Sequence, residues 1–113
     1  MVALVADLFF ADRIIEIGKT VDEAVTICHT SREFQSLVNR EPPSLAVVDL
    51  SLLNEDDLTW VAKIPHVAGF GPHVDHNRFQ MARNLGIRDL WANSAMARKL
   101  GPWILASRDL PSP

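Results

Sequence analysis

The stretch "SLAVVDL", residues 44–50, sets one carboxylate inside an apolar run. Residues 45–48 show no alternation of polar and apolar side chains, which predicts a short strand buried on both faces. A charged group inside a core is costly unless it is paired or lies where the strand meets solvent. We therefore expect Asp49 to end the strand at the mouth of a pocket.

Other short apolar runs alternate with stretches of helical periodicity along the chain. The expected strands are residues 2–6, 25–28, 45–48, 67–70 and 87–91. The expected helices are residues 8–19, 31–40, a short segment that ends before Pro65, 75–86 and a last segment from Ser94. Because the strands lack strict alternation, helices should cover both faces of the sheet. The pattern predicts a doubly wound, three-layer α/β sandwich with a five-stranded parallel sheet.

Polar residues ahead of the apolar stretches predict where helices begin. Ser31 is expected to cap its helix alone, because Glu33 is not at capping-box spacing from it. Gly86 predicts a helix end, and Gly101-Pro102 should weaken the last helix. The other expected caps are Asn54 or Asp56, Asp75 and Ser94.

Composition bounds the class of protein. The chain has 113 residues, 48% of them hydrophobic, which suits one domain over residues 1–105 with a tail at 106–113. A formal net charge of −3 does not support binding to nucleic acid or to anionic membranes. Acidic residues interrupt the apolar start at Asp7 and Asp12, so we expect neither a signal peptide nor a membrane span. The single cysteine, Cys28, excludes an internal disulfide and fits a reducing cytoplasm.

A further pattern follows the strands. Asp7 comes after the first strand and precedes an "RI" pair, and Asp49 lies near the end of "AVVDL". The stretch "ARNLGIRDLW", residues 82–91, leads into the fifth strand. In this order and spacing, residues 2–105 resemble the receiver domain of bacterial two-component response regulators, which has a flavodoxin-like fold.

The resemblance implies phosphoryl chemistry at the carboxyl ends of the strands. In that family an acidic pair holds Mg²⁺, an aspartate accepts phosphate, and a Ser or Thr and a Lys bind the phosphoryl group. Asp49 matches the phosphate acceptor, whereas Ala6 replaces one member of the acidic pair beside Asp7. Gly71 and Asn93 stand where the hydroxyl and the Lys are expected. These losses disfavour the phosphorylated state, so we expect a pseudo-receiver that ordinary aspartyl phosphorylation does not switch.

Two interpretations of the acidic residues stay open. Asp7 and Asp49 form a small acidic pocket with residual Mg²⁺ binding, or each accepts backbone N–H groups as a helix cap. Phosphorylation of Asp49 is a further alternative. We expect no other cofactor.

The stretch "GFGPHVDH", residues 69–76, occupies the place of the missing hydroxyl. Gly69, Gly71 and His73 form a candidate anion-binding loop, because glycines allow close approach and free amides attract anions. A metal site formed by His73, His76 and Asp75 is disfavoured, since the sequence offers no further nearby ligand to complete it. The plain alternative is a turn with an Asp cap and exposed histidines.

Aromatic residues gather late in the chain. Trp91, Met96 and Trp103 are interpreted as core residues, with an exposed patch over the fourth helix, fifth strand and fifth helix as the alternative. Receiver domains commonly dimerise or meet partners on that face. Cys28 and His29 are not expected to form a reactive pair, because adjacent residues of a strand point to opposite faces. Cys28 is therefore interpreted as a small core residue.

These observations leave two functions. The first is a stand-alone signalling or scaffold module in the cytoplasm, without enzymatic activity, that contacts a protein partner or a second copy and neither nucleic acid nor membrane. The second is a sensor or enzyme of flavodoxin-like fold that binds a phosphate-bearing small ligand around residues 69–73. The second function lacks a complete nucleotide fingerprint, because no third glycine follows "GFG" at the required offset.

Overall fold

The computed structural model describes residues 1–109. Its sheet has five parallel strands in the order β2-β1-β3-β4-β5. The strands are β1 (Val2–Leu4), β2 (Thr26–Cys28), β3 (Leu45–Asp49), β4 (His66–Gly71) and β5 (Asp89–Ala92). The helices are α1 (Leu8–Thr20), α2 (Ser31–Arg40), the short 3-10 helix η1 (Leu50–Leu52), α3 (Glu55–Val61), α4 (His76–Asn84) and α5 (Asn93–Arg108). This architecture confirms the predicted doubly wound α/β fold.

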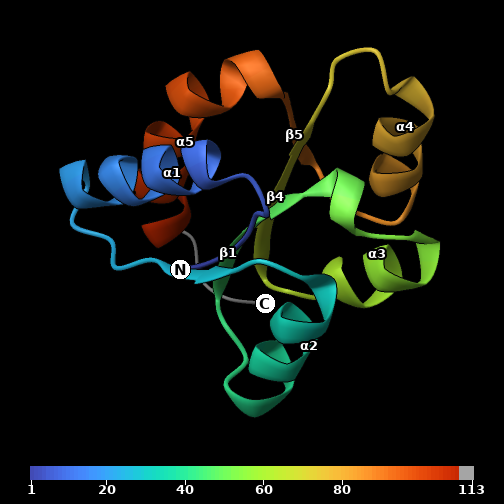
Figure 1. Ribbon diagram of the computed structural model, residues 1–113, viewed down its shortest axis with the longest axis horizontal. Helices are drawn as coiled ribbons and strands as arrows, with labels where there is room; N and C mark the ends of the chain where they lie inside the picture. The colour runs from blue at the N-terminus through green and yellow to red at the C-terminus, as the bar shows by residue number, and fades with distance from the viewer. Residues whose placement is uncertain (110–113) are drawn as a thin grey trace.

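Helices cover both faces of the sheet (Figure 1). α1 and α5 pack on one face, the α1–α5 face, while α2, α3 and α4 lie on the other, the α2–α4 face. Ala46 and Val48 of β3 enter the core of the α2–α4 face and Val47 enters the opposite core, all fully buried. Burial on both faces explains why residues 45–48 lack polar alternation. Within residues 1–109, no helix has the length and apolar character that crossing a membrane requires.

The strand order reverses around β1, which lies between β2 and β3. Leu4 is opposite Cys28 on one side and Val48 on the other, so the three strands end at nearly the same level. In open parallel sheets, functional groups gather beyond the carboxyl ends of the strands at such a reversal. We call this edge the carboxyl rim; it carries the segments that follow β1, β3, β4 and β5.

The start of α2 differs from the prediction. Thr30, not Ser31, caps the helix: its backbone is extended, and its Oγ1 accepts a hydrogen bond from the N–H of Glu33 at 3.1 Å. The carboxylate of Glu33 reaches back and accepts the N–H of His29 at 3.4 Å. The prediction that Ser31 caps alone was therefore wrong by one residue, because Glu33 lies at capping spacing from Thr30.

Of the other predicted helix caps, two are confirmed and one is wrong. Asn54 caps α3 in a reciprocal pair with Asp57, and Asp75 caps α4, as predicted. The prediction for Ser94 was wrong. α5 begins at Asn93 directly after β5 and has no side-chain cap.

The last helix is longer than predicted. α5 runs through Gly101-Pro102 to Arg108, so the boundary expected at residue 105 falls inside it. Gly101 is buried near α1, where an added Cβ would meet a side chain of α1 at 3.7 Å. Close packing against α1 offsets the backbone hydrogen bond that a proline cannot donate. Residues 110–113 of the expected tail lie outside the described residues.

The late aromatic residues contribute to the core of the α1–α5 face. Trp91 and Met96 are buried, and Trp91 packs edge-to-face on the half-buried Trp103 with ring centroids 5.6 Å apart. Cys28 is buried on the α2–α4 face, where burial raises the pKa of its thiol and the charge of Glu33 adds to the rise. These positions confirm the interpretation of all four residues as core or half-core.

Candidate functional site

Asp49 lies where β3 meets the carboxyl rim, as the sequence predicts. Its side chain is half-buried. One carboxylate oxygen, Oδ1, accepts the N–H of Ser51 at 2.9 Å and the hydroxyl of Ser51 at 2.7 Å, which caps η1. The carboxylate therefore has a structural task at the start of the next helical turn.

Asp7 has the same task in the segment that follows the neighbouring strand, β1. It is the N-cap of α1, and its Oδ1 accepts the N–H groups of Phe9 at 2.8 Å and Phe10 at 3.1 Å. The two residues that follow it, Leu8 and Phe9, are 71% and 76% exposed, so apolar side chains flank this carboxylate. Since β1 and β3 are adjacent, Asp7 and Asp49 lie on one rim, but each binds groups of its own helix.

The donor set at this rim does not fit Mg²⁺. Within residues 1–109 there is no group of three or more His, Cys, Asp or Glu side chains that could hold a metal ion. Mg²⁺ takes an octahedral set of oxygen ligands. Ala6 contributes none, and both rim aspartates already use one oxygen as a cap. The two histidines near Asp75 likewise belong to no such group.

Gly71 and Asn93, which the resemblance predicts as the switch-equivalent positions, lie on the same rim. Gly71 ends β4 opposite Ala92, the last residue of β5, and Asn93 follows Ala92 as the first residue of α5. Neither residue supplies a hydroxyl or an ammonium group. Steric crowding does not explain why residue 71 is a glycine, because the nearest atom to an added Cβ would be Phe79 Cζ at 3.8 Å.

The candidate anion-binding loop is corrected by the structure. Gly69 and Gly71 lie within β4, which is longer than predicted at both ends, so no glycine-rich turn forms. Packing favours glycine at position 69 instead: an added Cβ would lie 2.7 Å from Leu50 Cδ2 and 3.2 Å from Leu90 Cδ2, so these leucine side chains would have to move. Of the three residues predicted for this loop, only the exposed His73 follows the strand.

Comparison with known proteins bears on the fold. No protein-family model matches the sequence, and no curated protein matches it significantly. A CheY-like response regulator receiver domain protein from Methanospirillum hungatei matches with a TM-score of 0.82 at 18% identity, over 96% of this chain and 91% of that chain. The receiver domain of NtrX from Brucella abortus matches with a TM-score of 0.82 at 14% identity, over 97% of this chain and 98% of that chain. The chain has a receiver fold.

A longer NtrX structure from Brucella abortus shows how much of such a protein the chain represents. It matches with a TM-score of 0.76 at 13% identity, over 95% of this chain and 27% of that chain. The chain thus spans about a quarter of the length of that protein. Sequence identities of 13–18% show a shared fold and nothing about shared chemistry. The chemistry of the rim is therefore inferred from the residues of this chain.

Arg78 is a rim residue that sequence reasoning missed. Its Nη1 donates to the backbone carbonyls of Leu50 at 3.0 Å and Leu53 at 2.6 Å, and its Nε donates to Asp75 Oδ2 at 3.1 Å. Arg78 thereby ties α4 of the receiver fold to the segment that follows Asp49. The pairing with Asp75, three residues earlier, was visible in the sequence; the carbonyls, 25 and 28 residues away, were not.

The guanidinium does not replace the missing cation. Within residues 1–109, the charge partner of Arg78 is Asp75, and neither Asp7 nor Asp49 forms an ion pair. Lys99 lies on α5 and is exposed. Arg78 therefore contacts the segment that follows Asp49 but pairs with Asp75 and not with Asp49.

A groove lies between α4 and β5, on the face that the sequence suggested for partners. It encloses about 310 Å³. Exposed His73, His76 and Arg83 line it together with half-buried Phe79 and Leu90. We call it the α4–β5 groove; it combines basic side chains with an apolar floor.

Proposed function

We propose that the chain is a signalling module of receiver fold that works through contact with a protein partner, and that ordinary aspartyl phosphorylation does not switch it. One observation carries the proposal: Gly71 and Asn93 stand at the rim where a hydroxyl and an ammonium group would bind a phosphoryl group. Phosphoryl chemistry builds up negative charge that must be neutralised. Within residues 1–109 no basic side chain pairs with the carboxylate of Asp49, so a phosphoryl group there would meet no cation already in place.

The contacts of Arg78 support this proposal. A switch needs two arrangements of its moving parts whose populations a signal can shift. Arg78 joins α4 to the segment after β3 by hydrogen bonds to the carbonyls of Leu50 and Leu53. These bonds hold the two segments together, so a rearrangement of the rim would have to break them.

The α4–β5 groove supports contact with a protein. Its basic residues His73, His76 and Arg83 complement an acidic segment, and its floor of Phe79 and Leu90 suits apolar side chains. We therefore assign to this groove an acidic segment of a partner protein that carries apolar residues. A second copy of the chain is the alternative occupant.

Labelling by acetyl phosphate tests the absence of a phosphoryl switch. The wild-type chain and Asp49→Asn are incubated with radiolabelled acetyl phosphate, with and without Mg²⁺. We expect no Mg²⁺-dependent label on the wild type beyond that on Asp49→Asn. Label that needs Mg²⁺ and disappears in Asp49→Asn would overturn this part of the proposal.

Site-specific photo-crosslinking in cells tests the contact surface. A photoreactive residue is placed at Gln80, which is exposed and lines the groove, or at Ser36 on α2 as the control. We expect a discrete adduct from Gln80 that Ser36 does not give. An adduct of twice the chain mass identifies a second copy as the occupant, and equal adducts from both positions contradict the assignment.

Two further points belong to the proposal. A cytoplasmic location suits the free, buried thiol of Cys28. We propose no enzymatic activity, because the alternative of a phosphate-bearing ligand at residues 69–73 rested on a glycine-rich turn, and Gly69 and Gly71 belong to β4 instead.

A further inference from the structure

Exposed apolar side chains gather at the carboxyl rim. Among residues 1–109 four large apolar side chains are exposed, and three of them, Leu8, Phe9 and Val74, lie in segments that follow β1 and β4. The fourth, Leu105, lies on α5 and is 48% exposed. Apolar side chains scattered singly over a surface are ordinary, whereas a group of them in one place marks a contact surface. We call Leu8, Phe9 and Val74 the apolar rim residues.

The fold does not account for the exposure of Leu8 and Phe9. They begin α1 after its cap Asp7, at positions where helices favour acidic side chains, yet the first turn of α1 has none. The next residue, Phe10, makes the core contact of this turn, because its ring packs edge-to-face on the buried Phe70 with centroids 5.8 Å apart. Leu8 and Phe9 are therefore available to contact another molecule.

Val74 lies on the same rim, a short distance across the sheet. β1 and β4 both pair with β3, so their axes lie about 10 Å apart. Val74 is 69% exposed in the loop between β4 and α4, whereas Leu8 and Phe9 begin a helix that covers the other face of the sheet (Figure 1). The segments that carry the apolar rim residues therefore flank the end of β3, where Asp49 lies.

The polar neighbours of the apolar rim residues differ in charge between the two segments. Two exposed carboxylates lie on the α1 side and two exposed imidazoles lie around Val74: Asp7, Asp12, His73 and His76. None of the four forms an ion pair within residues 1–109. Arg13 is also exposed on α1, so the acids outnumber the bases there by two to one. Imidazole N–H groups donate hydrogen bonds to carboxylates, so the two sides are complementary.

A surface with an acidic apolar half and an imidazole-bearing apolar half is complementary to a second copy of itself. A two-fold axis that lies in the rim between the two halves sets the start of α1 of one copy against the β4–α4 loop of the other, and the reverse contact forms at the same time. We propose that two copies of the chain associate through the carboxyl rim in this way. Leu8 and Phe9 of one copy then pack against Val74 of the other, and the association covers Asp49 of both copies.

Sedimentation of the purified chain tests the association, at concentrations from about 10 μM to about 1 mM. We expect a reversible dimer. Phe9→Glu and Val74→Lys each set a charge among apolar contacts and should weaken the dimer at least about tenfold. Both side chains are exposed, so the fold should persist, which circular dichroism and urea unfolding check. Leu105→Glu is the matched control, because it removes an exposed apolar side chain outside the rim, and it should leave the dissociation constant unchanged.

Mixing the two variants tests the reciprocal geometry. If residue 9 of one copy faces residue 74 of the other, an equimolar mixture of Phe9→Glu and Val74→Lys pairs opposite charges at one contact and keeps the native side chains at the other. We therefore expect the mixture to associate more strongly than either variant alone. A chain that stays monomeric at every concentration, an equal loss in Leu105→Glu, or a mixture that associates no better than its components would overturn the proposal.

The test is separate from those of the proposed function. His73 and His76 also line the α4–β5 groove, so the variants leave both histidines unchanged. Gln80→Ala, in the groove, should not affect the association. A loss of the dimer in Gln80→Ala that Phe9→Glu does not show would place the second copy in the groove and overturn association through the rim. Phosphate labelling and partner cross-linking keep their own outcomes whether or not the purified chain forms a dimer.

Discussion

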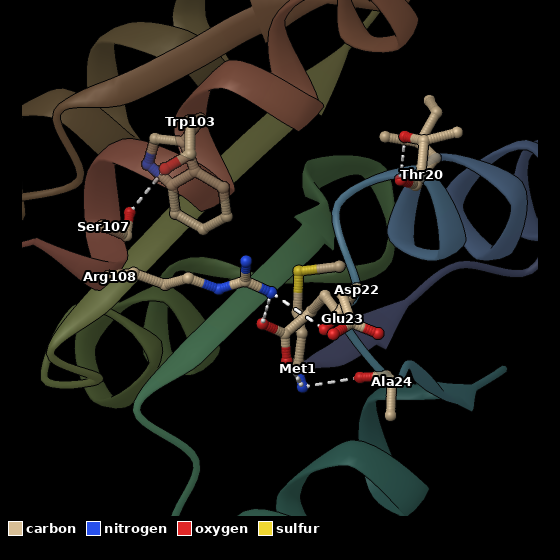
Figure 2. Close-up of polar contacts among 9 residues, drawn as sticks. Met1, Thr20, Asp22, Glu23, Ala24, Trp103, Ser107 and Arg108 are labelled. Carbon is tan, nitrogen blue, oxygen red and sulfur yellow. Dashed lines mark hydrogen bonds and ion pairs between the residues drawn. The ribbon is translucent and has the colours of Figure 1, made fainter.

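Acidic side chains have different partners at the two edges of the sheet, the amino edge where β1, β3 and β4 begin and the carboxyl rim where the strands end. At the amino edge, Glu23 joins the Met1 ammonium group and the Arg108 guanidinium, which are 22 and 85 residues away along the chain. Figure 2 shows Arg108 reaching from the end of α5 to the segment between α1 and β2. At the carboxyl rim, the hydrogen bonds that Asp7 and Asp49 accept within residues 1–109 come from groups two or three residues away. The carboxylate of Glu23 serves the tertiary structure, whereas the carboxylates of Asp7 and Asp49 serve local helix starts.

This difference explains how a receiver fold can lack phosphoryl-binding residues and remain intact. The rim carboxylates are satisfied by the backbone of their own helices, so the fold does not need a lysine or a second aspartate beside them. Burial of the strands on both faces supplies the main driving force for folding. The rim can therefore lose its phosphoryl chemistry while the architecture persists.

The largest effect on stability is expected from Glu23→Gln at the amino edge. The half-buried carboxylate holds two charged donors at 3.0 and 3.1 Å, so its loss should lower the free energy of unfolding by about 2 kcal/mol. Urea denaturation measures the change. Glu16→Gln on the exposed side of α1 is the control and should change stability by less than about 0.5 kcal/mol. Equal losses in the two variants would remove the distinction between the edges.

Arg78→Gln should have the next largest effect. It removes the bonds to the carbonyls of Leu50 and Leu53, which should cost about 1.5 kcal/mol. Hydrogen exchange of the amides in residues 50–54 should become faster, because the segment loses its tie to α4. Arg83→Gln is the control on the same helix, since among residues 1–109 the Arg83 side chain hydrogen-bonds to Gln80 at 3.4 Å and to no residue of the segment after β3. Unchanged exchange in Arg78→Gln would show that Arg78 does not hold this segment.

Substitutions of Asp7 test whether the rim acids act as caps alone. Asp7→Ala removes an N-cap and should lower the free energy of unfolding by about 1 kcal/mol. Asp7→Asn keeps an oxygen that accepts the N–H groups of Phe9 and Phe10, so its stability should stay close to wild type. Thermal or urea unfolding compares the three chains. A loss in Asp7→Asn as large as in Asp7→Ala would mean that the negative charge itself matters.

The smallest effect is a pH dependence that belongs to the amino edge. Burial raises the pKa of Glu23, but hydrogen bonds and charges from Met1 and Arg108 outweigh it and hold the pKa below its ordinary value of 4.5. A group with a lowered pKa in the folded state stabilises the protein above its unfolded-state pKa, and this stability is lost as pH falls through the folded-state pKa. Acidification below pH 4.5 should therefore destabilise wild type more than Glu23→Gln. Parallel stability curves for the two chains would contradict this origin.

The fold was predictable because its signals are local and repeated. The apolar run at residues 45–48, the cap Asp75 and the helix end at Gly86 each lie within a few residues of the feature they indicate. The predicted cap of α2 was wrong because Thr30, not its neighbour Ser31, caps the helix. The predicted weakening of the last helix at Gly101 was wrong because α5 packs closely against α1 at this residue.

The site was predictable only in part. The positions of Asp7, Asp49, Gly71 and Asn93 on one edge followed from the parallel arrangement of the strands, which the lack of polar alternation indicated. Contacts between distant segments left no such signal. The carbonyl acceptors of Arg78 are backbone atoms, which any sequence would supply.

The glycines of β4 show the same limit from another side. Gly69 looked like a turn residue, whereas its role depends on Leu50 and Leu90 packing against the strand from other parts of the chain. Sequence periodicity and spacing give no information about hydrogen bonds to distant backbone atoms or about packing between distant segments.

Restoring the missing groups tests whether their absence makes the rim inert. The triple variant Ala6→Asp, Gly71→Ser and Asn93→Lys returns an acid, a hydroxyl and an ammonium group, and a Cβ at Gly71 would make only ordinary contacts, the nearest at 3.8 Å. The measurement is the rate of Asp49 phosphorylation by acetyl phosphate and Mg²⁺ in the triple variant and in wild type. We predict that the triple variant is labelled and wild type is not; wild type labelled at Asp49 at the rate of the triple variant would contradict the inert rim.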